Sequence, residues 1–268
     1  MPEPLDSHPL ALNPLVFHPG AVAPTGRVAL VTGGAGKVGA TVVRALASRG
    51  YAVAIHAHQS LFEARELAAQ LDAAGVPSLA VTANLRDEGP VRAMVQRVAD
   101  HFGRIDALVT CAAIWHAGQL EELTAEDLRA HFDINCVGSF VAAQEAGAFM
   151  VRQPDGGSIV TLGDWAVARP YSDYAAYFPS KGAIPALTRS LAVEFAARNP
   201  RVRVNCVLPG PVTLPPDMEP EARAAVLAGT LVNREGSPEH VAHAVLFLLE
   251  NDFVTGICLP VDGGRTIA

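Results

Sequence analysis

The sequence has few aromatic residues, few cysteines and little positive charge. Aromatic residues make up 6% of its 268 residues, and acidic residues outnumber basic ones to give a formal net charge of −7. An acidic balance disfavours nucleic acid or an anionic membrane as the main partner. No uninterrupted apolar run reaches the roughly 18 residues that a membrane-spanning helix needs. We therefore expect a protein that acts on a small molecule.

The four cysteines show no spacing typical of a metal site. Each lies in or beside an apolar run, which indicates reduced, small core residues of a cytoplasmic protein. His56 and His58 are two residues apart, but no acidic residues accompany them, so we expect no metal. The cysteines are Cys111, Cys136, Cys206 and Cys258.

Residues 1–26 are rich in proline and show no hydrophobic periodicity. They also lack a basic segment followed by an apolar one, so they do not resemble a secretory signal. This composition predicts an extended, flexible arm in front of a domain that covers residues 27–268.

Half of the residues are hydrophobic, which suits one large α/β domain over residues 27–268. Short apolar runs alternate with longer amphipathic segments along this domain. The alternation predicts a Rossmann-type, doubly wound parallel sheet of about seven strands flanked by helices. The expected strands are 27–32, 51–57, 77–83, 105–111, 158–162, 201–208 and 256–261, and the expected helices are 40–49, 61–74, 86–102, 123–152, 174–199 and 238–249.

A glycine-rich turn lies between the first expected strand and the helix that follows it. Glycines let backbone N–H groups approach a pyrophosphate at a helix N-terminus, where the helix dipole favours anions. The order strand, turn, helix, strand therefore predicts a dinucleotide site. The residues expected to form it are Thr32, Gly33, Gly36, Lys37, Val38 and Gly39.

No acidic residue follows the second expected strand. Such a residue would accept hydrogen bonds from the adenosine ribose of NAD. Basic and hydroxyl side chains could instead meet a 2′-phosphate, which favours NADPH, with NADH as the alternative. The residues expected at this phosphate are Lys37, His56, His58 and Ser60, and Gln59 between them is expected to contact the cofactor.

Three side chains could transfer protons together. Tyr177 and Lys181 are four residues apart, so on a helix they share one face. The ammonium group is expected to lower the tyrosine pKa from about 10 and make Tyr177 a general acid near neutral pH. Asp164 follows the apolar run at residues 158–162, so it is expected at the C-terminal end of a strand, where ligands bind. The simpler alternatives are a solvated helix face for the pair and a helix cap for Asp164.

Taken together, these motifs resemble the short-chain dehydrogenase/reductase family from residue 27 to the end. Tyr177 and Lys181 match its catalytic pair, and Asn135 matches an asparagine in the middle of its long helix. The resemblance implies that Asn135 holds a water linking Lys181 to solvent. Residues 261–264, V-D-G-G, match the family's C-terminal turn. Further cofactor contacts are implied for Asn84, Leu85, Cys111, Ala112, Ala113, Tyr177, Lys181, Pro209, Gly210 and Val212.

Two departures from the family pattern resemble its pteridine reductase branch. Lys37 stands in the cofactor turn, and Asp164 stands where most members have a catalytic serine. An aspartate suits a nitrogen-rich ring, because it can accept N–H bonds or deliver a proton to a ring nitrogen. Trp115 falls where that branch places an aromatic residue on the pterin, whereas Gln59 replaces the branch's arginine. The implied substrate residues are Trp115, Asp164, Tyr177, Pro211, Leu214 and Met218.

Three functions follow from the resemblance. The first is NADPH-dependent reduction of a pterin or similar nitrogen heterocycle. The second is reduction of a ketone by a carbonyl reductase or alcohol dehydrogenase, and the third is a catalytically silent NADP(H)-binding sensor or scaffold. An enoyl reductase fits less well, because its tyrosine-to-lysine spacing is longer. The family also implies a homotetramer or homodimer paired through the long helix and the Tyr177 helix.

Overall fold

The computed structural model describes residues 25–268, so the arm expected over residues 1–26 lies almost entirely outside the described residues. Seven parallel strands form one sheet in the order β3-β2-β1-β4-β5-β6-β7. The predicted Rossmann-type sheet is confirmed. The order reverses between β1 and β4, which is where ligands bind in open α/β sheets. The strands are β1 (Val28–Thr32), β2 (Ala52–His56), β3 (Ser78–Val81), β4 (Ala107–Thr110), β5 (Gly157–Leu162), β6 (Val202–Pro209) and β7 (Cys258–Val261).

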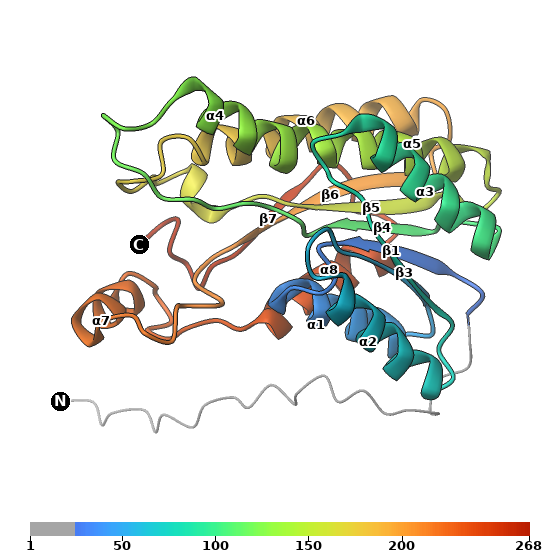
Figure 1. Ribbon diagram of the computed structural model, residues 1–268, viewed down its shortest axis with the longest axis horizontal. Helices are drawn as coiled ribbons and strands as arrows, with labels where there is room; N and C mark the ends of the chain where they lie inside the picture. Colours follow the sequence, from blue (N-terminus) through green and yellow to red (C-terminus); the bar gives the residue numbers. More distant parts are fainter. Residues whose placement is uncertain (1–24) are drawn as a thin grey trace.

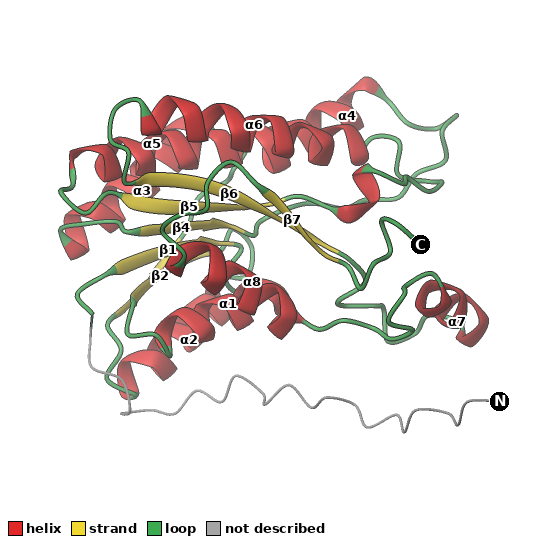
Figure 2. Ribbon diagram, turned by 180° about the vertical axis from the view of Figure 1, so that it is seen from behind, coloured by secondary structure: helices red, strands yellow, loops and turns green. Residues whose placement is uncertain are grey.

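Helices cover both faces of the sheet (Figures 1 and 2). Helices α3, α4, α5 and α6 lie on one face, and α1, α2 and α8 lie on the other, while α7 projects beyond the C-terminal ends of the strands. The helices are α1 (Lys37–Ala47), α2 (Leu61–Ala73), α3 (Glu88–Phe102), α4 (Ala125–His131), α5 (Gly138–Arg152), α6 (Phe178–Ala196), α7 (Pro220–Ala228) and α8 (Pro238–Glu250).

Each face of the sheet has its own hydrophobic core. Successive strand residues point to opposite faces, so Val31 joins the core beneath α1 and α8 while Leu30 joins the core beneath α3 and α5. Both are fully buried, as expected for a parallel sheet covered on two sides. The two cores hold the C-terminal ends of β1, β4 and β5 side by side.

The helix expected over residues 123–152 is interrupted. A capping box at Thr124 begins α4, and a π-helical segment, η1 (Phe132–Val137), separates α4 from α5. A side chain at Gly138 would lie 2.6 Å from the Leu85 carbonyl oxygen, so the chain is tightly constrained where α5 begins. Such π segments are frequent at functional sites, and Asn135 lies inside this one.

Two other helix expectations are corrected. The helix expected from residue 174 begins at Phe178, with Tyr177 as its N-cap. The segment after β6, expected to be a proline-rich loop, contains α7, which begins with Pro220 in its first turn. Proline is well tolerated there because its missing N–H has no partner in that turn.

One segment, Ala125–Arg152, is long and apolar enough to span a membrane by length and mean composition, although charged residues interrupt it. Half of its most apolar stretch is buried inside the protein. Val141 and Met150 lie in the core that α5 shares with α3. The segment therefore packs as a core element of the domain.

Candidate active site

Asp164, Tyr177 and Lys181 come together beyond the end of β5. The Tyr177 hydroxyl donates to Asp164 Oδ2 at 2.8 Å. Asp164 Oδ1 accepts from the Ala166 backbone N–H at 2.8 Å, so the carboxylate also caps a short 3-10 helix. Lys181 Nζ donates to the Leu162 carbonyl oxygen at 2.8 Å. The helix cap and the tyrosine partner are thus two roles of one carboxylate.

The expected effect of Lys181 on Tyr177 is wrong in this arrangement. The pKa of Tyr177 is raised, first by burial and then by the neighbouring Asp164 carboxylate, which stabilises the protonated phenol. Burial lowers the pKa of Lys181, although Asp164 opposes this. The Lys181 ammonium is directed to the Leu162 carbonyl, so the nearest charge to the phenol is negative.

The pKa of Asp164 is raised, which favours its protonated form and hence its use as an acid. Burial raises the pKa of its carboxyl above the ordinary value, against the lowering effects of the Ala166 and Tyr177 hydrogen bonds. A carboxyl group starts about six pKa units below a phenol. Asp164 therefore remains the stronger acid of the hydrogen-bonded pair.

Asn135 joins the site to the loop after β4. Its Oδ1 accepts from the Ile114 N–H at 2.8 Å, and its Nδ2 donates to the Ile114 carbonyl at 3.0 Å and to Ser180 Oγ at 3.0 Å. Both ends of this amide therefore have protein partners, and the expected water-holding role stays a prediction. The geometry makes Asn135 a positioning residue that ties η1 to α6 and to Ile114.

An aromatic wall, defined as Trp115, Tyr171, Tyr174 and Phe178, stands beside Tyr177. Trp115 stacks on Tyr174 with ring centroids 4.8 Å apart and an interplanar angle of 6°. Its side chain is 49% exposed, so it retains free surface. Tyr171 and Tyr174 each meet Phe178 edge to face. The wall offers flat apolar surface near the acid pair, with one face of Trp115 already occupied.

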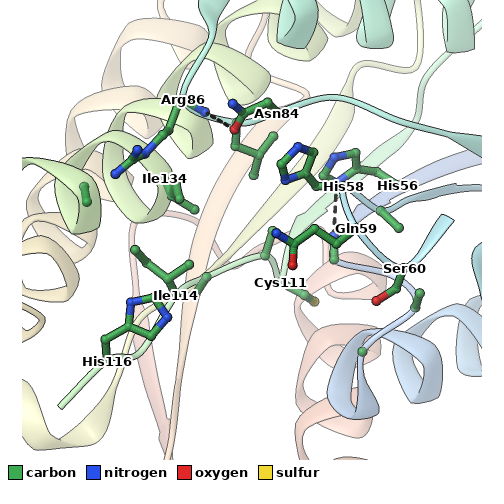
Figure 3. A pocket seen from close by; sticks show the side chains of 18 of the residues that line it. His56, His58, Gln59, Ser60, Asn84, Arg86, Cys111, Ile114, His116 and Ile134 are labelled. Carbon is green, nitrogen blue, oxygen red and sulfur yellow. Dashed lines mark hydrogen bonds between the residues drawn. The ribbon is translucent and has the colours of Figure 1, made fainter.

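A cavity of about 780 Å³ lies at the strand-order reversal between β1 and β4. Figure 3 shows His58, Gln59 and Ser60 near one end, and Ile114 and His116 near the other. Asp164, Tyr177 and Lys181, together called the proton-transfer group, do not line this cavity. Lys181 is nevertheless close enough to Cys111, on the cavity wall, to affect the pKa of that thiol. The predicted cofactor residues that line it are Gly33, Gly36, His56, His58, Gln59, Ser60, Asn84, Leu85, Cys111, Ala112 and Ala113.

His56 lines this cavity but has a different task from the one expected. Its Nδ1 accepts from the Gly33 N–H at 3.2 Å, and its Nε2 donates to the Ala83 carbonyl at 3.0 Å. Burial lowers its pKa, which favours this neutral form. With both nitrogens engaged, His56 fixes the glycine turn rather than facing a phosphate. His58, Gln59 and Ser60 are exposed.

The glycine turn leaves no room for side chains at two positions. Gly33 has φ +64°, and a Cβ there would lie 2.8 Å from Ala112. A Cβ at Gly39 would lie 2.1 Å from the Gly33 carbonyl oxygen. At Gly36, the N-cap of α1, nothing lies closer than 3.4 Å and no side chain caps the helix. The open helix N-terminus is a ready site for an anion.

Gly39→Ala is expected to destabilise the protein by about 1–3 kcal/mol, because an overpacked backbone must shift. Dinucleotide binding is expected to weaken with it. The matched control is Gly89→Ala in α3, where an added Cβ meets nothing within 4 Å. Urea unfolding midpoints measure the difference. Equal midpoints for the two variants would show that the turn tolerates a side chain.

The remaining predicted residues lie around the cavity or on its far side. Lys37, Val38 and Gly39 begin α1, and Thr32 ends β1. Gly210 N–H donates to the Val261 carbonyl at 2.9 Å, and Pro211 and Val212 line a separate cavity of about 290 Å³. Leu214 and Met218 belong to the segment before α7, and neither lines a cavity with the proton-transfer group.

Several residues in or near the cavity were missed by the sequence reasoning, and His131, which does not line it, is one of those nearby. His131 is buried. Its Nδ1 contacts the Asp127 carbonyl oxygen at 2.8 Å, and its Nε2 accepts from the His116 N–H at 3.3 Å. Its ring centroid lies 6.0 Å from that of Tyr177. No local signal marks it, because its role depends on a loop 15 residues away. Arg86 was detectable, since it directly follows two predicted residues. The other lining residues that were missed include Ala35, Ile114, His116 and Ile134.

A family model described as enoyl-(acyl carrier protein) reductase matches residues 33–266. An uncharacterized oxidoreductase of Methylorubrum extorquens is 33% identical over 246 residues, which cover 89% of this chain and 97% of the relative. Human 3-oxoacyl-(acyl-carrier-protein) reductase is 34% identical over 239 residues, with coverage of 89% and 97%.

A solved structure gives the same picture. The crystal structure of a blue fluorescent protein from a metagenomic library, in complex with NADPH, is 35% identical, with a TM-score of 0.83. The match covers 90% of this chain and 98% of that one. The similarity therefore extends over nearly all of the described domain.

Proposed function

Since the chain belongs to the short-chain dehydrogenase/reductase family, we propose that it is an NADPH-dependent reductase of a flat nitrogen heterocycle of the pterin class. The observation that carries the proposal is the hydrogen bond from Tyr177 to Asp164, together with the raised pKa of that carboxyl. A serine in this place could polarise a ketone, but it could not supply a proton.

The cavity at the strand-order reversal suits a dinucleotide. Gly33, Gly36 and the uncapped N-terminus of α1 would hold the pyrophosphate. Ser60 begins α2 without a side-chain cap, so its hydroxyl is free toward the same cavity. When bound, NADPH supplies the hydride. The NADPH complex of the metagenomic blue fluorescent protein supports this assignment.

The protein's own residues supply the proton. Asp164 is the stronger acid of the pair and is the proposed source of the proton. Tyr177 donates its hydroxyl hydrogen to the substrate nitrogen while it accepts a hydrogen from protonated Asp164. Lys181, fixed by the Leu162 carbonyl, places a positive charge near the carboxylate that remains. Asn135 ties η1 to α6 through Ser180, three residues after Tyr177, and so helps to position Tyr177.

The aromatic wall supports a flat substrate. Trp115 retains exposed surface next to Tyr174, and a heterocycle could extend the stack. Burial against such a ring would raise the pKa of Asp164 further.

A ketone is the second candidate substrate. The human relative is a 3-oxoacyl-(acyl-carrier-protein) reductase, and its identity of 34% is of the same order as that of the other matches. In this reading the Tyr177 hydroxyl polarises a carbonyl oxygen and Asp164 only orients it. An enoyl substrate, which the name of the family model suggests, fits the four-residue spacing of Tyr177 and Lys181 less well.

The test compares substrates with the purified protein. NADPH consumption is followed with dihydrobiopterin and, separately, with a panel of β-keto esters and simple ketones. Turnover of the pterin with weak or no turnover of ketones supports the proposal. Ketone turnover alone selects the second candidate, and NADPH binding without any turnover selects the sensor reading.

Gln59→Arg is expected to lower the KM for NADPH by about tenfold, because a guanidinium can form charge-assisted bonds to a 2′-phosphate. The KM for NADH should stay unchanged. Gln70→Arg on the exposed side of α2 is the matched control for added charge. If Gln59→Arg leaves the NADPH value unaltered, the 2′-phosphate does not lie at the end of β2.

A homotetramer or homodimer, and a cytoplasmic location, remain predictions. Exposed apolar side chains on the expected pairing elements support association. Val137 at the end of η1 is 45% exposed, and Val193 on α6 is 71% exposed. Light scattering after size exclusion tests this, and a monomer would contradict it.

A further inference from the structure

Two of the four cysteines face each other at the edge of the sheet. Cys206 in β6 and Cys258 in β7 are direct partners in the parallel register. Neighbouring strands lie about 4.8 Å apart, and disulfides bridge Cα separations of about 4.4–6.8 Å. The Cys206 thiol donates to the Val207 carbonyl oxygen at 3.4 Å. The pair can therefore be joined with little movement of the backbone.

The two thiols differ in charge and exposure. Cys258 is partly exposed, and Arg189 Nη1 donates to its sulfur at 3.9 Å. The Cys206 thiol and the Arg189 charge lower the pKa of Cys258 to about 7. Cys206 is buried, and its hydrogen bond to Cys258 together with burial raises its pKa. One member is thus a stabilised thiolate and the other a protected thiol.

The other two cysteines lack these features. Burial raises the pKa of Cys111 to about 12 and also raises that of Cys136. Neither has a cysteine partner, and Arg189 contacts only Cys258 among the four. The sequence predicted four reduced, small core residues, and all four cysteines are free, but only Cys206 is buried.

We propose that Cys258 and Cys206 form a peroxide-sensitive dithiol, with Cys258 as the attacking thiol and Cys206 as the resolving thiol. The Cys258 thiolate attacks one oxygen of hydrogen peroxide, the O–O bond breaks, and hydroxide leaves to give a sulfenic acid. The Cys206 sulfur then attacks the sulfenic sulfur, the S–O bond breaks, and a disulfide forms. The thiol hydrogens pass to the departing oxygens, so one peroxide is reduced to two waters.

The pair lies next to the catalytic segment. A Cβ added at Gly163 would lie 3.3 Å from the Cys206 sulfur, and Gly163 immediately precedes Asp164. Leu162, the residue before it, accepts the hydrogen bond from Lys181. The disulfide would draw the Cys206 sulfur toward β7, away from Gly163. Oxidation of the pair would thereby change the packing against Gly163, whose backbone leads into Asp164.

The test treats the reduced full-length protein with equimolar hydrogen peroxide, followed by non-reducing peptide mapping. We expect a cross-link between the Cys206 and Cys258 peptides within one chain, loss of the mass of two hydrogen atoms, and free thiols at Cys111 and Cys136. A cross-link between two chains, or one that involves Cys111 or Cys136, would overturn the proposal, as would overoxidation of Cys258 without a cross-link.

Two variants keep the test independent of folding losses. In Cys206→Ala, a sulfenic acid at Cys258 should be trapped by dimedone. Arg189→Gln should slow alkylation of Cys258 near neutral pH about fivefold, since loss of the guanidinium raises the thiol pKa by about one unit. Arg198→Gln is the matched control and should leave that rate unchanged. Equal rates for the two arginine variants would overturn the assignment of Arg189 as a charge that stabilises the Cys258 thiolate.

Discussion

Tyr177→Phe is expected to lower kcat by about 10²–10⁴, the usual contribution of a positioned proton donor. The variant keeps the ring that packs against His131 and Phe178 and removes only the hydroxyl that bonds to Asp164. The path from the carboxyl to the substrate is then broken. Steady-state kinetics with NADPH and dihydrobiopterin measure the effect, and KM should change much less than kcat.

Tyr51→Phe is the matched control for this loss. Tyr51 is also buried and also has a raised pKa caused first by burial, but it lies at the amino end of β2, away from the cavity at the strand-order reversal. Its removal should leave kcat within about threefold. A Tyr177→Phe variant that retains nearly full turnover would show that Asp164 reaches the substrate without the hydroxyl.

Replacing Asp164 is expected to change the pH profile as well as the rate. The protonated carboxyl is the active form, so kcat/KM should fall as pH rises through the raised pKa of Asp164. Asp164→Asn keeps a polar side chain without a transferable proton and should lose about 10²-fold or more in kcat. In that variant, kcat/KM should no longer fall as pH rises through the range in which Asp164 titrates in the wild type.

Asp164→Asn, although it should lose activity, is not expected to lose stability. Because the folded pKa of Asp164 lies above its unfolded value, its stabilising contribution is present at low pH and is lost as pH rises through the folded pKa. Asp164→Asn should therefore be at least as stable as the wild type at neutral pH.

The control for the pH profile of activity is Asp72→Asn, because Asp72 likewise accepts from a backbone N–H and a hydroxyl, both of Ser78. That variant should keep the wild-type pH profile of activity. A wild-type pH profile in Asp164→Asn would contradict the assignment.

The fold followed from the sequence because its signals were local. Strands such as residues 28–32 are continuous apolar runs, and parallel strands buried on two faces have that pattern. Gly33 and Gly39 marked the turn for a similarly local reason, since the backbone conformation at Gly33 and the close approach at both positions demand glycine. The existence and order of the strands could thus be predicted.

Several features could not be predicted because they depend on contacts far apart in the chain. The π segment around Asn135 is tied to Ile114 and Ser180. The Tyr177 pKa is raised first by burial and then by a carboxylate 13 residues away, rather than lowered by Lys181 on its own helix. Helix α7 was hidden because its flanking prolines suggested a loop, although Pro220 suits a first helical turn. Periodicity along the chain carries no information on such pairings.

In the proposed reaction, Asp164 and Tyr177 together deliver a proton to a nitrogen heterocycle. The most direct test is NADPH consumption by the wild type and by Asp164→Ser, each measured with dihydrobiopterin and with a ketone panel. We expect pterin turnover in the wild type, its loss in Asp164→Ser, and no such loss with ketones. Turnover confined to ketones, or a faster Asp164→Ser enzyme with the pterin, would contradict it.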